Sequence, residues 1–197
     1  MRAGMGLLKG VAWCSLIVVS SCEGLDLLNL DAAQRRNYTY CGSGENWEPE
    51  WEMFEEEVLE LINDVRSRGA DCHSKGTFPA VGPLSLNEEI RCAARSHSMD
   101  MALREYFDHT NPDGEQPWDR MAEEGYEYYA AGENIAAGFA TPATAVAAWL
   151  ASDGHCANLM AAGYLDTGVG FYVLGSGALS LADHLMRTDL LQPLPLL

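Results

Sequence analysis

Hydrophobic positions in the first third of the domain recur at steps of three and four residues, which is the period of an amphipathic helix. Residues 50–68 carry one such stripe, made of Trp51, Phe54, Val58, Leu61, Ile62 and Val65. Gly69 follows directly and is a typical helix stop. The pattern therefore predicts a helix over 50–68.

A second stripe follows a loop rich in glycine and proline. Ser85 and Glu88 have the spacing of a capping box, which predicts that a helix starts there and runs to about Arg104. Its apolar face is formed by Leu86, Ile90, Ala94, His97 and Met101. We therefore expect His97 to be a core histidine whose nitrogens are satisfied by hydrogen bonds.

The remaining pattern alternates helices and strands. Thr141 followed by Pro142 is a standard helix start. Helices are expected over 117–124, 142–152 and 152–160, and strands over 132–138 and 166–173. This alternation predicts a single α/β domain, over about 47–185, whose helices pack on a small sheet.

The first 21 residues have the composition of a signal peptide, with Arg2 and Lys9 preceding an apolar segment at 11–19. Small residues before Cys22 resemble a bacterial lipobox, in which Cys22 would carry a lipid anchor. Ordinary cleavage, which releases a soluble product, is the alternative. Residues 22–46 then form a tether, and no later stretch has the length of a transmembrane helix.

Six cysteines favour an oxidising compartment: Cys14, Cys22, Cys41, Cys72, Cys92 and Cys156. Loss of Cys14 with the signal and lipidation of Cys22 leave an even four. We expect a disulfide between Cys72 and Cys92, which would remove roughly 3 kcal/mol of chain entropy from the unfolded state. The remaining pair is Cys41 with Cys156, and a free Cys156 is the alternative.

The charge of the chain excludes one class of partner. A formal net charge of −17 and a pI near 4.4 argue against nucleic-acid binding, which requires a basic surface. A hydrophobic content of 48% permits a sizeable core. The nucleophile elbow, the HExxH zinc motif and the common nucleotide-binding loops are all absent from the sequence.

Three polar residues at the edges of predicted elements are candidates for chemistry: His109, Glu133 and His155. The start of a helix disfavours a protonated imidazole, so we expect His155 to be neutral and able to act as a ligand. Two neutral imidazoles and a carboxylate suit Zn²⁺, with His109 and His155 as ligands. Their separations match no local ligand motif, and the sequence requires no cofactor.

Several segments together resemble the CAP superfamily, also called SCP-like proteins, which includes cysteine-rich secretory proteins, antigen 5 and pathogenesis-related proteins. They are "LINDVRSRGADC", "LSLNEEIRCAARSHSMDM", "YFDHTNPDGEQPWDRMAEEGY", "AGENIAAGFATP" and "WLASDGHCANLM" with "GVGFYV". They occur in collinear order over about 58–173. The closest likeness is to the bacterial secreted branch.

This resemblance implies an α-β-α sandwich with a central cleft lined by two histidines and two glutamates. His109, Glu133 and His155 match three of these positions, whereas the position of the second glutamate reads Ser152. The missing glutamate weakens the inference of Zn²⁺ binding or catalysis. We expect Glu133 to organise both histidines, and Asn134 beside it to be structural.

The function implied is that of an exported protein, which is either a membrane-anchored lipoprotein or an extracellular or periplasmic protein. It would be a non-enzymatic binding module of the cell envelope whose cleft holds a lipid, a glycan or an envelope protein. The alternative is a metal-assisted hydrolase of cell-wall or protein substrates, with Glu133 as general base. A purely structural role for the three residues is the third possibility.

The C-terminal end departs from the family pattern. After "GVGFYV" the chain continues with few aromatic residues, and residues 186–197 end in an alternation of proline and leucine. We interpret 186–197 as a divergent tail. On this interpretation an edge strand of the sheet would be missing or poorly formed.

Overall fold

The computed structural model describes residues 47–173 and 179–187. The expected signal peptide, tether, Cys22 and Cys41 lie outside these residues, as does most of the expected tail. In the part of the chain that is described, no helix is both long and apolar enough to cross a bilayer.

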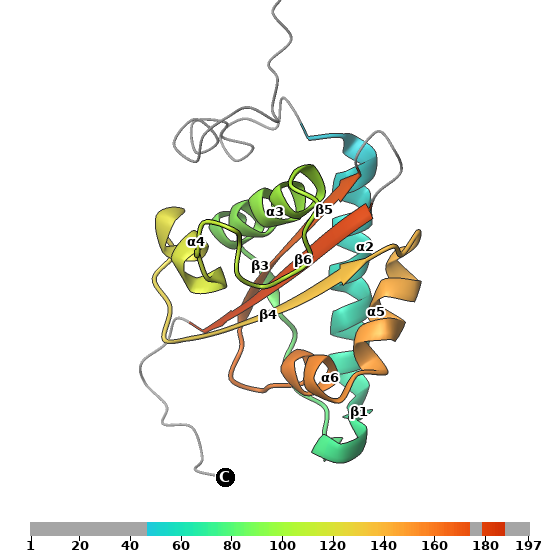
Figure 1. Ribbon diagram of the computed structural model, residues 1–197. Coiled ribbons are helices and arrows are strands. Elements are labelled where there is room, and N and C mark those ends of the chain that lie inside the picture. The colour runs from blue at the N-terminus through green and yellow to red at the C-terminus, as the bar shows by residue number, and fades with distance from the viewer. Residues whose placement is uncertain (1–46, 174–178, 188–197) are drawn as a thin grey trace, which may run out of the picture.

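Six helical segments and six strands make up the described chain (Figure 1). The helical segments are α2 (Pro49–Arg68), η2 (His73–Lys75), α3 (Glu88–Leu103), α4 (Pro117–Glu123), α5 (Pro142–Leu150) and α6 (Asp153–Leu159). The strands are β1 (Ala70–Asp71), β2 (Thr77–Phe78), β3 (Ser85–Leu86), β4 (Ala130–Ala137), β5 (Asp166–Val173) and β6 (Leu179–Arg187). The expected helix at 50–68 and its glycine stop are thus confirmed.

The main sheet has the strand order β3-β5-β6-β4 and is covered on both faces. Helices α3 and α4 lie on one side of it, and α2, α5 and α6 lie on the other (Figure 1). The larger core cluster joins Val58 and Ile62 of α2 to Trp149 of α5 and to the sheet. The architecture is therefore the α-β-α sandwich of a single α/β domain, as the sequence predicted.

Two glycines of β5 let α3 lie directly on the sheet. A Cβ atom at Gly168 would overlap the backbone nitrogen of Arg91, and one at Gly170 would overlap the backbone of Ala94. The hydroxyl of Ser98 donates to the carbonyl of Gly170 over 2.6 Å, which fixes the contact. The "TGVG" sequence is therefore a packing motif, because any side chain would push α3 away.

The cap of α3 differs from the prediction. The N-cap is Asn87, whose side chain accepts from the backbone nitrogen of Ile90 over 2.9 Å. Ser85 belongs to β3 instead, and its backbone nitrogen donates to the carbonyl of Leu165. The capping-box pattern was misleading because pairing with β5 uses the residues just before the helix. His97 is buried, as expected.

The expected defect at the C-terminal edge of the sheet is wrong. Strand β6 is well formed and lies inside the sheet, with antiparallel partners on both sides. Its residue Leu185 pairs with Gly132 of β4, and its residue His184 pairs with Gly168 of β5. The strand runs to Arg187, beyond the expected domain boundary of 185. The edge strand beside β6 is β4, which carries the candidate residue Glu133.

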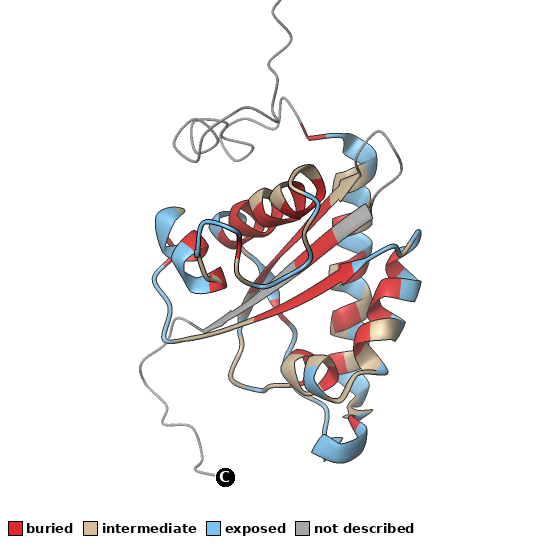
Figure 2. Cartoon of the chain, in the orientation of Figure 1, coloured by how far each residue is buried: buried red, intermediate tan, exposed pale blue. Residues whose placement is uncertain are grey.

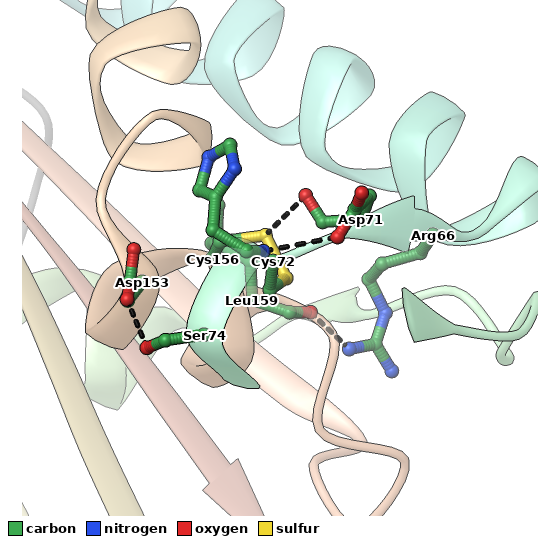
Figure 3. Close-up of a disulfide and its surroundings, with 8 residues drawn as sticks. Arg66, Asp71, Cys72, Ser74, Asp153, Cys156 and Leu159 are labelled. Carbon is green, nitrogen blue, oxygen red and sulfur yellow. Dashed lines mark hydrogen bonds between the residues drawn. A yellow bond between two sulfur atoms is a disulfide. The ribbon is translucent and has the colours of Figure 1, made fainter. Parts of the chain in front are cut away.

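The expected disulfide pairing is also wrong. Cys72 is bonded to Cys156, which joins η2 to α6 across 84 residues of sequence (Figure 3). Cys92 is itself disulfide-bonded, to a partner outside the described residues. Loop closure favoured Cys72 with Cys92 in sequence, but α3 turns Cys92 away from η2 because that helix packs on the opposite face of the sheet.

Candidate functional site

The residues of "GEN" (132–134) face alternate sides of edge strand β4. Gly132 makes room for α6, since a Cβ there would lie 2.5 Å from the side-chain oxygen of Asn158. Asn134 is fully buried and accepts a hydrogen bond from Asn158 Nδ2 over 3.1 Å. Asn158 also donates to the carbonyl of Glu133 over 3.4 Å. The motif therefore fastens α6 to β4, partly through Asn134.

Glu133 is held by two strong polar contacts. Its Oε1 lies 2.6 Å from His109 Nδ1, and its Oε2 accepts from Arg120 Nη2 over 2.9 Å. The Nε2 of buried His97 is 3.9 Å from the same Oε2. The carboxylate side chain is only 2% exposed. Burial of a carboxylate is tolerated here because a cation and a hydrogen-bonding imidazole face it.

Arg120 of α4 is the residue that the sequence reasoning missed. Besides Glu133, its guanidinium donates to the carbonyl of His109 over 3.0 Å and to that of Glu115 over 3.1 Å. It therefore fixes both the histidine and the loop that carries it. A signal was present in the sequence, since Arg120 is the only Arg or Lys between Glu105 and Val173.

His97 and Tyr106 form hydrogen bonds that fix the backbone just before His109. His97 Nε2 lies 3.1 Å from the carbonyl of Asp108, and its Nδ1 lies 3.3 Å from the Tyr106 hydroxyl. That hydroxyl donates to Asp100 over 2.8 Å, and burial raises the pKa of Tyr106. His97 is thus a satisfied core histidine that also positions the backbone just before His109.

His109 and His155 have opposite electrostatic environments. The hydrogen bond to Glu133 raises the pKa of His109, whose side chain is 47% exposed, and partial burial only partly offsets this. Burial lowers the pKa of His155, and the charge of His109 lowers it further. The sequence predicted a neutral His155 from the helix start, whereas desolvation is the main physical cause. Pairs of this kind can divide acid and base roles.

The expected arrangement of Glu133 between both histidines is only half present. Its two oxygens are directed to His109 and Arg120, while His155 is coupled to His109 through charge. His155 instead faces a hollow of about 480 Å³ beside β4 and α6. The hollow is lined by Lys75, Glu133, Asn134, Ser152, Gly154, His155, Ala157, Asn158 and Ala161. Sequence reasoning identified Glu133 and His155 but not the other residues that line the hollow, such as Lys75.

Lys75 belongs to η2, and this segment is attached to α6 by two bonds. One is the Cys72–Cys156 disulfide, and the other is a hydrogen bond from the Ser74 hydroxyl to Asp153 (Figure 3). The bond from Ser74 lowers the pKa of Asp153. The position of Lys75 at the hollow therefore depends on the disulfide to Cys156, which is the residue after His155.

A tightly bound Zn²⁺ fits these residues poorly. Zinc sites use at least three protein ligands, and no group of three His, Cys, Asp or Glu side chains comes together within residues 47–173. Glu133 is already neutralised by Arg120, whose positive charge opposes a metal cation. The same two contacts orient the Glu133 carboxylate toward His109 and Arg120.

Replacing Glu133 with glutamine is expected to lower the pKa of His109 and to raise that of His155. The neutral amide no longer stabilises imidazolium, and a less charged His109 repels a proton on His155 less. Titration of the ring protons by NMR measures both values. In the wild type, His109 stabilises the fold at acidic pH and loses this contribution as pH rises through its elevated pKa. His155 has a lowered pKa in the folded protein, so its protonation at acidic pH destabilises the fold.

Unchanged titration of His109 in Glu133→Gln would contradict this assignment of the cause.

Comparison with known proteins supports the same architecture. The family model of cysteine-rich secretory proteins, abbreviated CAP, matches residues 59–181 and so reaches into β6. YkwD of Bacillus subtilis is 37% identical over 123 residues, which are 62% of this chain and 44% of YkwD. The match thus spans less than half of that relative.

Solved structures agree with this result. An extracellular protein of Bacillus anthracis that contains an SCP domain is 26% identical, with a TM-score of 0.60 over 72% of this chain and 44% of that protein. An outer surface protein of Borrelia burgdorferi is 16% identical, with a TM-score of 0.55 over 70% of this chain and 92% of that protein. The latter likeness concerns the fold alone.

Proposed function

The chain belongs to the CAP family of cysteine-rich secretory proteins, and on that premise we propose that it is an exported, non-enzymatic module that binds a glycan in the hollow beside β4. Export is supported by the similarity to an extracellular protein of Bacillus anthracis. The buried Cys72–Cys156 disulfide is consistent with an oxidising compartment.

The lining of the hollow is the observation that carries the proposal. Six of its nine residues have hydrogen-bonding side chains, and the other three are glycine or alanine. A volume of about 480 Å³ is within the range of small-ligand sites. Glu133 and Asn158 are already bonded to other residues, but the buried Nδ2 of Asn134 has no partner among the described residues. A lipid chain would offer no hydrogen bond to this group or to the polar side chains of Lys75, Ser152 and His155, which costs free energy. Sugar hydroxyls and acetamido groups can satisfy them, and this favours a glycan over a lipid.

The electrostatics of the site favour binding rather than hydrolysis. Glu133 is engaged by His109 and Arg120, so it positions the loop instead of activating water. His155 is neutral near pH 7 because its pKa is lowered, and a neutral imidazole can donate to or accept from a sugar hydroxyl. The proposed role of His155 is therefore that of a hydrogen-bonding partner for the ligand.

Calorimetric titration with a chito-oligosaccharide, an oligomer of N-acetylglucosamine, tests this function. We expect saturable binding that His155→Ala weakens by about tenfold, which corresponds to one hydrogen bond of ordinary strength. Lys75→Ala, at an exposed position, should weaken binding without affecting the fold. The matched control His73→Ala should bind like the wild type. Absence of saturable binding, or equal loss in His73→Ala, would refute a glycan site in this hollow.

A further inference from the structure

Helix α4 and the turn after it display aromatic rings to solvent. Trp118 is 46% exposed, Tyr128 36% and Tyr129 58%. Much of α4 and of the turn after it is exposed (Figure 2). We call the surface formed by Trp118, Asp119, Glu123, Glu127, Tyr128 and Tyr129 the α4 face. Exposed large aromatic side chains that are grouped in this way are typical of interaction surfaces.

The turn that carries Tyr128 and Tyr129 packs against α4 and rests on a fixed support. Tyr126, at the start of this turn, is buried against Met121 of α4 and donates to Asp166 of β5 over 2.8 Å. The turn is therefore anchored to the sheet, and the exposed rings lose little conformational freedom on binding.

The charge of this surface is negative. Residues 118–129 contain the carboxylates of Asp119, Glu123, Glu124 and Glu127. Their one basic residue, Arg120, is buried and directed to Glu133. Glu124 has a raised pKa because of burial and the neighbouring charge of Glu123.

We propose that the α4 face binds a cationic polypeptide segment rich in lysine or arginine. Ammonium and guanidinium groups are attracted to the faces of Trp and Tyr rings, by about 0.5 to 2 kcal/mol for each pair. The surrounding carboxylates steer a basic partner and repel an acidic one. Several rings and charges along one helix and turn match an extended segment better than a single small cation. This inference concerns a different surface from the proposed glycan hollow and does not depend on it.

Fluorescence anisotropy of a labelled deca-arginine peptide, titrated with the full chain, tests the proposal. We expect Trp118→Ala with Tyr129→Ala to weaken binding by about tenfold or more, as for interface hot spots. Glu123→Gln with Glu127→Gln should also weaken it. The matched charge control is Glu56→Gln with Glu57→Gln, at exposed positions of α2, and the matched aromatic control is Phe107→Ala.

The controls separate a specific surface from general attraction to an acidic protein. Both control variants should stay within about twofold of the wild type, since surface changes outside an interface are close to neutral. Equal weakening by the α2 charge control would mean non-specific attraction and would overturn the proposal. The same conclusion would follow if the ring variant bound normally, or if deca-glutamate bound as well as deca-arginine.

Discussion

Replacing Arg66 with methionine is expected to lower the free energy of unfolding by about 3 to 5 kcal/mol, because buried carbonyl groups would lose their donors. The guanidinium of Arg66 lies inside the protein and bonds to the carbonyl oxygens of four residues. It donates to Gly82, Leu159, Ala161 and Tyr164 over 2.8, 2.6, 3.2 and 3.3 Å, respectively.

These carbonyls explain why the effect should be large. Leu159 is the last residue of α6, where a helix leaves its carbonyl groups without partners (Figure 3). Arg66, a residue of α2, thus supplies a donor to the C-terminal end of α6. It connects α2 to the helix that carries His155. Removal of the buried cation recovers part of its desolvation cost, so the expected loss is smaller than the sum of the individual bonds.

Urea denaturation of the wild type and Arg66→Met measures this difference. The matched control is Arg68→Met, whose side chain is 64% exposed and bonds to Asp64 one turn earlier in the same helix. A surface pair of that kind contributes at most about 1 kcal/mol. Equal stability losses in the two variants would show that the carbonyl contacts of Arg66 do not hold α6.

Replacing both Cys72 and Cys156 with serine is expected to lower the free energy of unfolding by about 4 to 5 kcal/mol. The disulfide closes a sequence separation of 84 residues, and the chain-entropy model assigns a loop of this length that much stabilisation. Both sulfur atoms are buried, so the serine hydroxyls are also placed in apolar surroundings beside Met160. Denaturation in urea under non-reducing conditions gives the value.

Two further measurements define this prediction. Ser74→Ala removes the hydrogen bond between the same two elements but keeps the crosslink, so we expect it to cost less than about 1 kcal/mol. Non-reducing peptide mapping should recover the peptide that links Cys72 to Cys156. A peptide that links Cys72 to Cys92 would instead support the pairing expected from sequence and contradict the structure.

The crosslink also connects stability to the proposed function. Lys75 lies three residues after Cys72, and it lines the hollow that His155 faces. A doubly substituted variant that still folds is therefore expected to bind the chito-oligosaccharide more weakly, because η2 is no longer covalently fixed to α6.

The candidate site shows where reasoning from sequence reached its limit. Short-range signals placed Glu133 in a strand, His109 in a loop and His155 at a helix start, and all three positions hold. Arg120 was missed because its role depends on a contact with Glu133, 13 residues away, that no local pattern encodes. Lys75 was missed for the same reason, since it comes to the hollow through a disulfide that spans most of the domain.

Local periodicity and the turn residues determined the α-helices, two of the six strands (β4 and β5) and the α/β class, because these depend on interactions between neighbours along the chain. The family resemblance predicted the sandwich, and it pointed to His109, Glu133 and His155, of which Glu133 and His155 line the hollow. Only the tertiary structure decided the order of strands, the interior place of β6 and the partner of Cys72. These are contacts between distant segments, and they are selected by how the helices and strands pack together rather than by any short stretch of sequence.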